Sequence, residues 1–203
     1  MVVGKSEIKV GIVGLGTVGG GTATVLAENA DVIAARATAI RLAAVADIAT
    51  EKARAFLDDI GLKDTVLTDN WHDLINDPEI DIVVETIGGT TLSREVISAA
   101  LKAGKSVVTA NKDLLALYGG ELLAIAAEKQ TDLFFEAAVA GGIPVVQAVK
   151  EGLAGNRFKS IMGIVNGTTN FILTKMSETG EDFADALAEA QRLGYAEADP
   201  TSD

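Results

Sequence analysis

The stretch Lys9–Gly19, KVGIVGLGTVG, decides the fold, because an apolar run leads directly into a glycine-rich turn. Its first half, Lys9–Val13, is predicted to be a buried β-strand. Its glycines have the GxGxxG spacing: Gly14, Gly16 and Gly19. The first permits a tight turn, the second lets the backbone approach a pyrophosphate, and the third allows close helix–strand packing. The stretch therefore predicts a phosphate-binding turn between a strand and a helix.

A helix is predicted over Val18–Glu28, directly after this turn. The N-terminus of a helix offers free N–H groups and the positive end of the helix dipole to an anion. We therefore expect Thr17 and Val18 to bind a cofactor together with the three glycines.

Apolar runs and helical patterns alternate through the first two thirds of the chain. Further strands are predicted at Leu42–Ala46, Ile82–Glu85, Ser106–Thr109 and Leu133–Glu136. Further helices are predicted at Thr50–Ile60, Trp71–Asn76, Ser93–Ala103 and Gly120–Gln130. This alternation implies βαβ units with right-handed crossovers. The expected fold class is α/β, with a Rossmann-type doubly wound parallel sheet.

The pattern changes at the glycine-rich loop Ala140–Gly142. We place a first, nucleotide-binding domain at 1–140 and the start of a second domain at 141–203. The second part is predicted to contain a helix, a long strand and an Ala-rich helix, at Pro144–Gly152, Lys159–Val165 and Phe183–Leu193. The apolar face of the last helix is expected to pack on a sheet of the second domain or on a partner subunit.

Composition excludes several kinds of chemistry. The chain has 203 residues with no Cys, one His and a formal net charge of −12. Without Cys there is no disulfide, Cys-ligated metal or thiol nucleophile, and His72 alone cannot form a multi-histidine metal centre. His72 is interpreted as structural. The acidity argues against a nucleic-acid partner, and the chain has neither an 18-residue apolar run nor a secretory signal, so no membrane association and a cytoplasmic location are expected.

Asp47 ends the second predicted strand, where an acidic residue binds the adenosine ribose in this kind of fold. Its carboxylate would repel a 2′-phosphate and so favours NAD over NADP. Lys52 and Arg54 follow closely and act in the opposite direction. The residues therefore leave the choice between NAD and NADP open.

Ligands of open α/β sheets bind beyond the carboxyl ends of the strands. The stretches Glu85–Gly89 and Thr109–Lys112 follow two of the predicted strands, and Glu136 ends another. Lys112 is the strongest candidate for a catalytic role among these residues, because a lysine at the mouth of a cofactor cleft can polarise a carbonyl or orient a hydroxyl.

Six stretches together give the chain a family resemblance from about residue 9 to its end. They are GIVGLGTVGGG at Gly11–Gly21, ETIGG at Glu85–Gly89, TANKDLLA at Thr109–Ala116, EAAVAGGIP at Glu136–Pro144, GIVNGTTNFIL at Gly163–Leu173 and LGYAEADPTSD at Leu193–Asp203. With these motifs in this order, the chain resembles homoserine dehydrogenases. The resemblance implies that part of an α+β substrate and dimerisation domain follows the Rossmann-type sheet.

The resemblance implies the reversible NAD(P)-dependent interconversion of L-homoserine and L-aspartate 4-semialdehyde, on the route from aspartate to threonine and methionine. In the family, the residues matching Thr86 and Lys112 lie near the nicotinamide and the substrate, which makes Lys112 the candidate catalytic residue. Gly194 and Glu197 match substrate-contacting positions. Glu197 would receive the ammonium group of homoserine in a charge-assisted contact.

The resemblance also implies a monovalent-cation site, usually for sodium. Its ligands would be the carboxylate of Glu136 and the carbonyls of Val139, Gly141 and Ile143. Oxygen ligands alone suit a hard cation. The family is typically dimeric or tetrameric through the substrate domain, so a homodimer or tetramer is expected of the full enzyme.

In the family, a further Asp and a catalytic Lys follow the GYAEADPTSD motif, which here ends at Asp203. The sequence is therefore expected to be an N-terminal part of the enzyme, with little or no activity alone. One alternative is a stand-alone dinucleotide-binding or redox-sensing module without catalysis. A third interpretation is another enzyme of similar layout, such as an amino-acid or dihydrodipicolinate-type reductase, against which the stretches Thr109–Ala116 and Glu136–Pro144 argue.

Overall fold

The structure is a computed structural model that describes residues 5–164 and 166–196. The chain divides into two compact units, Met1–Gln147 and Ala148–Asp203, and each is described by itself. The domain boundary after residue 140 stays a prediction. None of the helices in the described ranges is long and apolar enough to cross a membrane.

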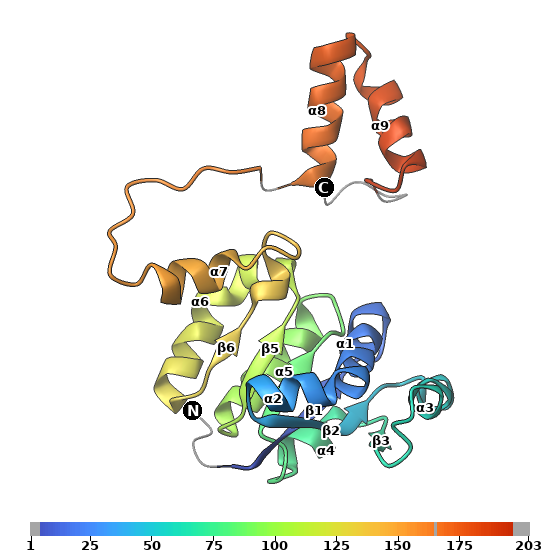
Figure 1. Cartoon of the computed structure of the whole chain (residues 1–203), viewed down its shortest axis with the longest axis vertical. Coiled ribbons are helices and arrows are strands. Elements are labelled where there is room, and N and C mark those ends of the chain that lie inside the picture. Colours follow the sequence, from blue (N-terminus) through green and yellow to red (C-terminus); the bar gives the residue numbers. More distant parts are fainter. Residues whose placement is uncertain (1–4, 165, 197–203) are drawn as a thin grey trace. The chain divides into compact units, whose positions relative to one another are not determined.

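A six-stranded sheet forms the centre of the first unit (Figure 1). Its strands, in sheet order, are β3 (Val66–Thr68), β2 (Ala39–Ala46), β1 (Glu7–Val13), β4 (Ile82–Glu85), β5 (Ser106–Thr109) and β6 (Leu133–Phe134). All neighbouring strands pair in parallel. The chain moves from β1 outward to β2 and β3, then returns to the other side of β1 with β4. The switch point of the topology, where such sheets bind ligands, therefore lies at the carboxyl end of β1.

Helices cover both faces of the sheet, because successive strand residues point to opposite faces. On one face, Ile12 and Val45 pack with α1 (Thr17–Glu28) and α3 (Thr50–Asp59). On the other, Val83 and Val107 pack with α4, α5 and α6. The bounds of these three helices are Trp71–Asn76, Thr91–Lys102 and Lys112–Lys129, and the short α2 spans Ala30–Arg36. The predicted doubly wound α/β fold is confirmed.

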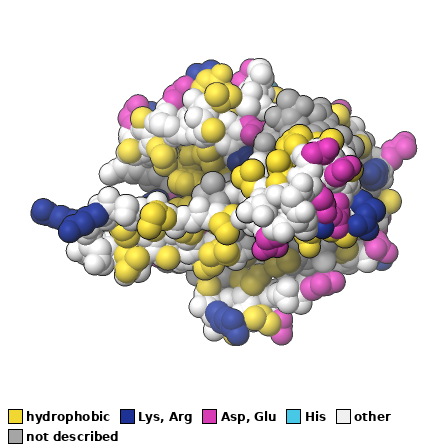
Figure 2. Space-filling view, turned by 90° about the horizontal axis from the view of Figure 1, so that it is seen from above, with side chains coloured by type: hydrophobic (Ala, Val, Ile, Leu, Met, Phe, Trp, Pro, Cys, Tyr) yellow, Lys and Arg dark blue, Asp and Glu magenta, His cyan; other side chains and the backbone are white. Residues whose placement is uncertain are grey.

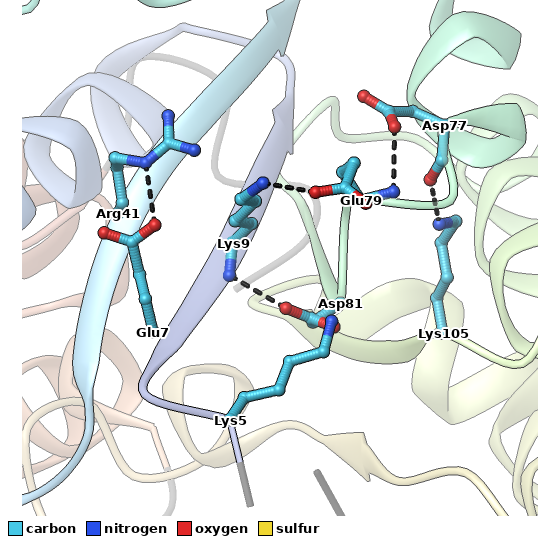
Figure 3. A network of polar contacts seen from close by, with 8 residues as sticks. All are labelled: Lys5, Glu7, Lys9, Arg41, Asp77, Glu79, Asp81 and Lys105. Carbon is cyan, nitrogen blue, oxygen red and sulfur yellow. Dashed lines mark hydrogen bonds and ion pairs between the residues drawn. The ribbon is translucent and has the colours of Figure 1, made fainter.

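A charged network lies at the amino ends of the strands (Figure 3). The carboxylate of Asp81, just before β4, pairs with the ammonium of Lys5 and accepts the N–H of Lys9 at 3.0 Å. Lys105, which is 6% exposed, donates to the carbonyls of Asp77 and Ile80 at 2.6 and 2.7 Å. Burial lowers the pKa of the Lys105 ammonium. These contacts join the start of β1 to the segments that enter β4 and β5.

The second unit contains a helical hairpin formed by α8 (Gly167–Thr179) and α9 (Phe183–Arg192). Ile172 of α8 packs against Ala186 and Ala190 of α9, together with Ala196. The apolar face of α9 therefore contacts α8, and its predicted packing on a sheet or a partner subunit is wrong for these residues. Apolar side chains also reach the surface of the chain beside acidic and basic ones (Figure 2).

One predicted element of the later chain is wrong. The strand Lys159–Val165 is absent over residues 159–164, and Val165 lies outside the described residues. A strand needs a hydrogen-bonding partner, and residues 148–164 and 166–196 contain no strand with which it could pair. The predicted helix Pro144–Gly152 is present, as the short α7 (Val145–Gln147) that continues directly into a π-helix at Ala148–Gly152.

Three elements of the structure, α2, β3 and α8, were not predicted from the sequence. In α8 the signal was present, because the side chain of Asn166 accepts the N–H of Thr169 at 2.8 Å and so caps the helix. Asn residues favour this N-cap position. An Asn cap also explains why α6 begins earlier than predicted. The helix was expected from Gly120 but begins at Lys112, because the side chain of Asn111 accepts the N–H of Leu114 at 3.1 Å.

Candidate functional site

The turn after β1 has a backbone that only glycine accommodates at two positions. Gly14 has φ +94°, and a Cβ there would lie 2.9 Å from the carbonyl oxygen of Thr86. A Cβ on Gly19 would lie 2.0 Å from the carbonyl oxygen of Gly14. The hydroxyl of Thr86 donates to that same Gly14 oxygen at 2.6 Å. The first turn of α1 is thus pressed against the ends of β1 and β4.

Gly16 differs from these two glycines, because a Cβ there would meet no atom within 4 Å. It is the N-cap of α1, and the first turn of that helix contains no acidic residue. The N–H groups and the dipole of the helix therefore face open space next to a residue without a side chain. This arrangement fits the close approach of a phosphate group to the backbone.

Asp47 follows β2 and hydrogen-bonds the glycine turn. Its carboxylate accepts the N–H of Leu15 at 2.6 Å and the N–H of Ala49 at 2.8 Å. Two cavities, of about 300 and 500 Å³, border both Gly16 and Asp47. Trp71 lines the smaller, which is mainly apolar, and Lys52 lines the larger.

The two basic residues expected near Asp47 behave differently. The guanidinium of Arg54 donates to the carbonyls of Thr65 and Lys63 at 2.6 and 3.0 Å and pairs with Asp58 at 3.3 Å. Arg54 does not line either cavity, whereas Lys52 does. Arg54 thus fixes the segment leading into β3 and leaves Lys52 as the cation beside Asp47.

A further cavity, of about 290 Å³, lies beyond the carboxyl ends of β4 and β5. Its lining includes Glu85, Thr86, Gly88, Asn111 and Lys112. Lys112 is exposed at the first position of α6. The structure therefore brings Gly14, Gly16, Gly19, Thr17, Val18, Asp47, Thr86 and Lys112 to one edge of the sheet, around the switch point.

Glu136 lies elsewhere, in a 3₁₀ turn after β6. Its two carboxylate oxygens accept the N–H groups of Val146 and Gln147, each at 2.8 Å. The carbonyl of Ile143 accepts the N–H of Val145 at 2.8 Å, and Gly141 has φ +59°. Within residues 5–164 and 166–196 no group of three or more His, Cys, Asp or Glu side chains surrounds a metal position. The sodium site remains a prediction.

Gly194, the predicted substrate residue of the second unit, follows α9 with φ +78°. It borders a cavity of about 880 Å³ that Asn166, Phe171 and Lys175 also line. Glu197 lies outside the described residues. Gly194 and Lys112 belong to different units, so the proposed substrate contacts stay predictions.

The stretches Glu85–Gly89 and Thr109–Lys112 were expected near the ligand, but the hydrogen bonds that join Glu85, Thr109 and Asn111 were not predicted. Glu85 and Thr109 are buried, and Asn111 links Thr109 to Gly89. The Asn that precedes a helical run was a recognisable capping signal. Burial of Glu85 was not recognisable, because it depends on which strands pair side by side.

The parallel sheet, the glycine turn at its switch point and the carboxylate that ends β2 define a Rossmann-type dinucleotide-binding protein. Residues 14–136 match the family model of the homoserine dehydrogenase NAD binding domain, and residues 144–203 match that of homoserine dehydrogenase. The chain belongs to the homoserine dehydrogenase family.

Named relatives agree with this assignment. The chain is 50% identical over 198 residues to the homoserine dehydrogenase of Neisseria gonorrhoeae, covering 97% of this chain and 44% of that protein. It is 54% identical over 196 residues to that of Pseudomonas aeruginosa, with the same two coverages. The chain thus spans less than half the length of these curated relatives.

Solved structures give the same result. A homoserine dehydrogenase from Thiobacillus denitrificans has a TM-score of 0.85 at 54% identity, covering 97% of this chain and 45% of that one. A hyperthermophilic archaeal homoserine dehydrogenase in complex with NADPH has a TM-score of 0.74 at 31% identity, covering 97% and 64%.

Proposed function

We propose that this chain forms the dinucleotide-binding part, and the beginning of the catalytic part, of an enzyme that interconverts L-homoserine and L-aspartate 4-semialdehyde. The observation that carries the proposal is the glycine turn at the switch point of a sheet whose sequence matches the family's NAD-binding model. The nicotinamide of the cofactor accepts or supplies the hydride, so the protein has to position the reactants and handle one proton.

The two halves of the cofactor would lie on opposite sides of β1. The N–H groups of Thr17 and Val18, beside Gly16, would hold the pyrophosphate. Asp47 would bind the hydroxyls of the adenosine ribose on the β2 side. The nicotinamide half then extends to the β4 and β5 side, over Thr86 and Lys112. Three separate cavities along this edge support that placement.

Lys112 is proposed as the catalytic residue. Lys112 lines the cavity beyond β4 and β5, where its ammonium would donate a proton to the carbonyl oxygen of the aldehyde or hold the hydroxyl of the alcohol. Gly194 and Glu197 would contact the amino-acid end of the substrate, with Glu197 on its ammonium group.

We propose NAD as the preferred dinucleotide. The carboxylate of Asp47 is fixed by two backbone N–H groups, so it would face a 2′-phosphate at close range. Of the two nearby cations, Arg54 is occupied by Thr65, Lys63 and Asp58, and Lys52 alone lines the cavity.

Three finer assignments rest on the family resemblance. We propose a sodium ion at Glu136 and the carbonyls of Val139, Gly141 and Ile143. We propose a cytoplasmic homodimer or tetramer for the whole enzyme, and a role on the route to threonine and methionine.

Binding of NADH to the chain itself tests the core of the proposal. Trp71, the one tryptophan of the sequence, lines the smaller cavity beside Asp47, so its fluorescence should change on saturation. Gly16→Leu fills the open space at the helix N-terminus and should abolish binding without unfolding the chain. Gly120→Ala, on α6 and also without a neighbour within 4 Å, is the matched control. Unchanged NADH affinity in Gly16→Leu would refute the proposed cofactor site.

A further inference from the structure

We propose that Glu85 is a positioning residue for the nicotinamide half of the cofactor, a role that rests on the proposed function. Its carboxylate fixes the two walls of the cavity beyond β4 and β5 without being exposed itself. Glu85 ends β4 and is 0% exposed.

Three neutral donors from three segments surround this carboxylate. One oxygen accepts the N–H of Ile87 at 2.9 Å and lies 2.8 Å from the hydroxyl of Ser93. The other accepts the hydroxyl of Thr109 at 2.7 Å. These donors come from the loop after β4, the first turn of α5 and the end of β5. The carboxylate therefore joins three chain segments at one point.

Packing alone does not explain a carboxylate at this position. Burial of a charged group is unfavourable unless hydrogen bonds compensate for the lost water, and an apolar side chain of similar size would fill the space without that cost. What Glu85 adds over an apolar residue is a fixed direction for each of its donors. It therefore determines where the surrounding loops lie.

One wall of the cavity is the loop Gly88–Gly89, whose residues have φ of +84° and +69°. Glycines in this region have wide conformational freedom, so the loop needs tethers to keep one shape. The amide of Asn111 donates to the carbonyl of Gly89 at 2.6 Å, and Ser93, whose hydroxyl donates to Glu85, borders the loop with its oxygen 3.0 Å from the carbonyl oxygen of Gly88. The tether from Asn111 comes from the group around Glu85.

The opposite wall is the start of α6. Thr109, held by Glu85, accepts the N–H of Asn111 at 3.1 Å. Asn111 in turn caps α6, whose first residue is Lys112. The chain of contacts thus runs from Glu85 through Thr109 and Asn111 to the backbone of Lys112. Glu85 positions this residue and the glycine loop together.

On the adenosine side, the hydrogen bonds of Asp47 involve none of the residues of this network. The contacts of Asp47 are to Leu15, Ala49 and Thr68. A defect at Glu85 should therefore weaken binding of the nicotinamide half and leave the adenosine half unchanged. ADP-ribose, which has the adenosine half and the pyrophosphate but lacks nicotinamide, separates the two.

The test compares Glu85→Gln with the unaltered chain by calorimetric titration of NADH and of ADP-ribose. In the variant, the amide nitrogen of Gln would face the hydroxyl of Thr109. An amide N–H₂ group cannot accept a hydrogen bond, so the hydroxyl of Thr109 would lose the acceptor for its own proton, while it still accepts the N–H of Asn111. We expect the Kd for NADH to rise about tenfold, since a buried polar group loses its partner. The Kd for ADP-ribose should change by no more than about twofold, which is smaller than the change expected when a bound ligand loses the effect of one buried hydrogen bond.

Thr109→Val repeats the test from the other side of the same hydrogen bond and should give the same selective loss. It carries the test if Glu85→Gln does not fold. Glu121→Gln, which removes the same charge from an exposed position on α6, is the control and should change neither affinity.

An equal loss for NADH and ADP-ribose would show a merely structural role and overturn the proposal, and so would unchanged affinity for both. If the unaltered chain binds neither compound, the proposed function itself fails. If it binds both, the outcome for Glu85 is decided separately.

Discussion

The carboxylate of Asp47 accepts the N–H of Leu15 at 2.6 Å, so the end of β2 is hydrogen-bonded to the turn that follows β1. The same carboxylate borders both cavities beside Gly16. One side chain therefore shapes the glycine turn and presents a negative charge to whatever lies over it. Substitution of Asp47 should alter the choice of ligand more than the stability of the fold.

Asp47→Asn should shift the ratio of NADH to NADPH affinity toward NADPH by about tenfold, since repulsion of a 2′-phosphate is removed while Lys52 stays in place. The measurement is the Kd of each dinucleotide, by calorimetry on the chain. Asp64→Asn, on an exposed turn, should leave the ratio unchanged. A ratio that does not move in Asp47→Asn would remove Asp47 from the specificity of the site.

Gly19→Ala should destabilise the first unit by about 1–3 kcal/mol, because the new methyl group has to displace the backbone oxygen of Gly14. Gly120→Ala should be neutral or stabilising, since its Cβ meets no atom and alanine favours a helix. Urea unfolding of both variants measures the difference. Equal free energies of unfolding would contradict the tight contact between α1 and the turn.

Asp81 should contribute to the acid dependence of stability. Burial acts to raise the pKa of its carboxyl, but the hydrogen bond from Lys5 and that from the N–H of Lys9 outweigh it, and the pKa lies below its usual 3.8. A pKa lowered in the folded state stabilises the protein above the unfolded value, and this stabilisation is lost as the pH falls through the folded value.

Asp81→Asn should therefore lower the free energy of unfolding at pH 7 by about 1–2 kcal/mol, as expected when a charge-assisted hydrogen bond is lost. Below the folded pKa the variant and the unaltered chain should differ less. Urea unfolding between pH 2.5 and pH 7, values chosen to bracket the usual carboxyl range, gives the two curves. Parallel curves over this range would show that Asp81 is not linked to acid unfolding.

Lys112→Met should lower kcat by about a hundredfold to ten-thousandfold, the range for loss of a general acid or base. The Kd for NADH should change much less than kcat, because Lys112 is exposed and its removal leaves the capping contacts of Asn111 intact. The measurement is homoserine-dependent NADH formation by the full-length gene product, with Lys129→Met as the matched control. Full activity of Lys112→Met would exclude Lys112 as the catalytic residue.

Apart from α2 and β3, the elements of the first unit were predictable because their signals are local. The apolar run at Lys9–Val13 and the glycine spacing after it depend on neighbouring residues only, and both have the predicted form. The strand expected at Lys159–Val165 failed for the opposite reason, since apolar character alone does not provide a pairing partner. A strand forms only where two chain segments pair, and the apolar run in the sequence identifies only one of the two.

The candidate site follows the same division. Gly14, Asp47, Thr86 and Lys112 were found because each stands at the end of a predicted strand or the start of the next helix. The hydrogen bond from the guanidinium of Arg54 to the carbonyl of Thr65 and the burial of Glu85 were not predictable from the sequence. Both depend on contacts between segments whose spacing in the sequence has no regular pattern.

The charged residues of Figure 3 lie at the amino ends of the strands, while the glycine turn and its cavities lie at the carboxyl ends. The sheet separates the two groups, and none of the contacts of Lys5, Asp81 or Lys105 described above involves a residue that lines these cavities. Thermal stability and cofactor affinity can therefore vary independently in this unit. Substitutions among these charged residues could therefore change the melting temperature of a relative without changing which dinucleotide it binds.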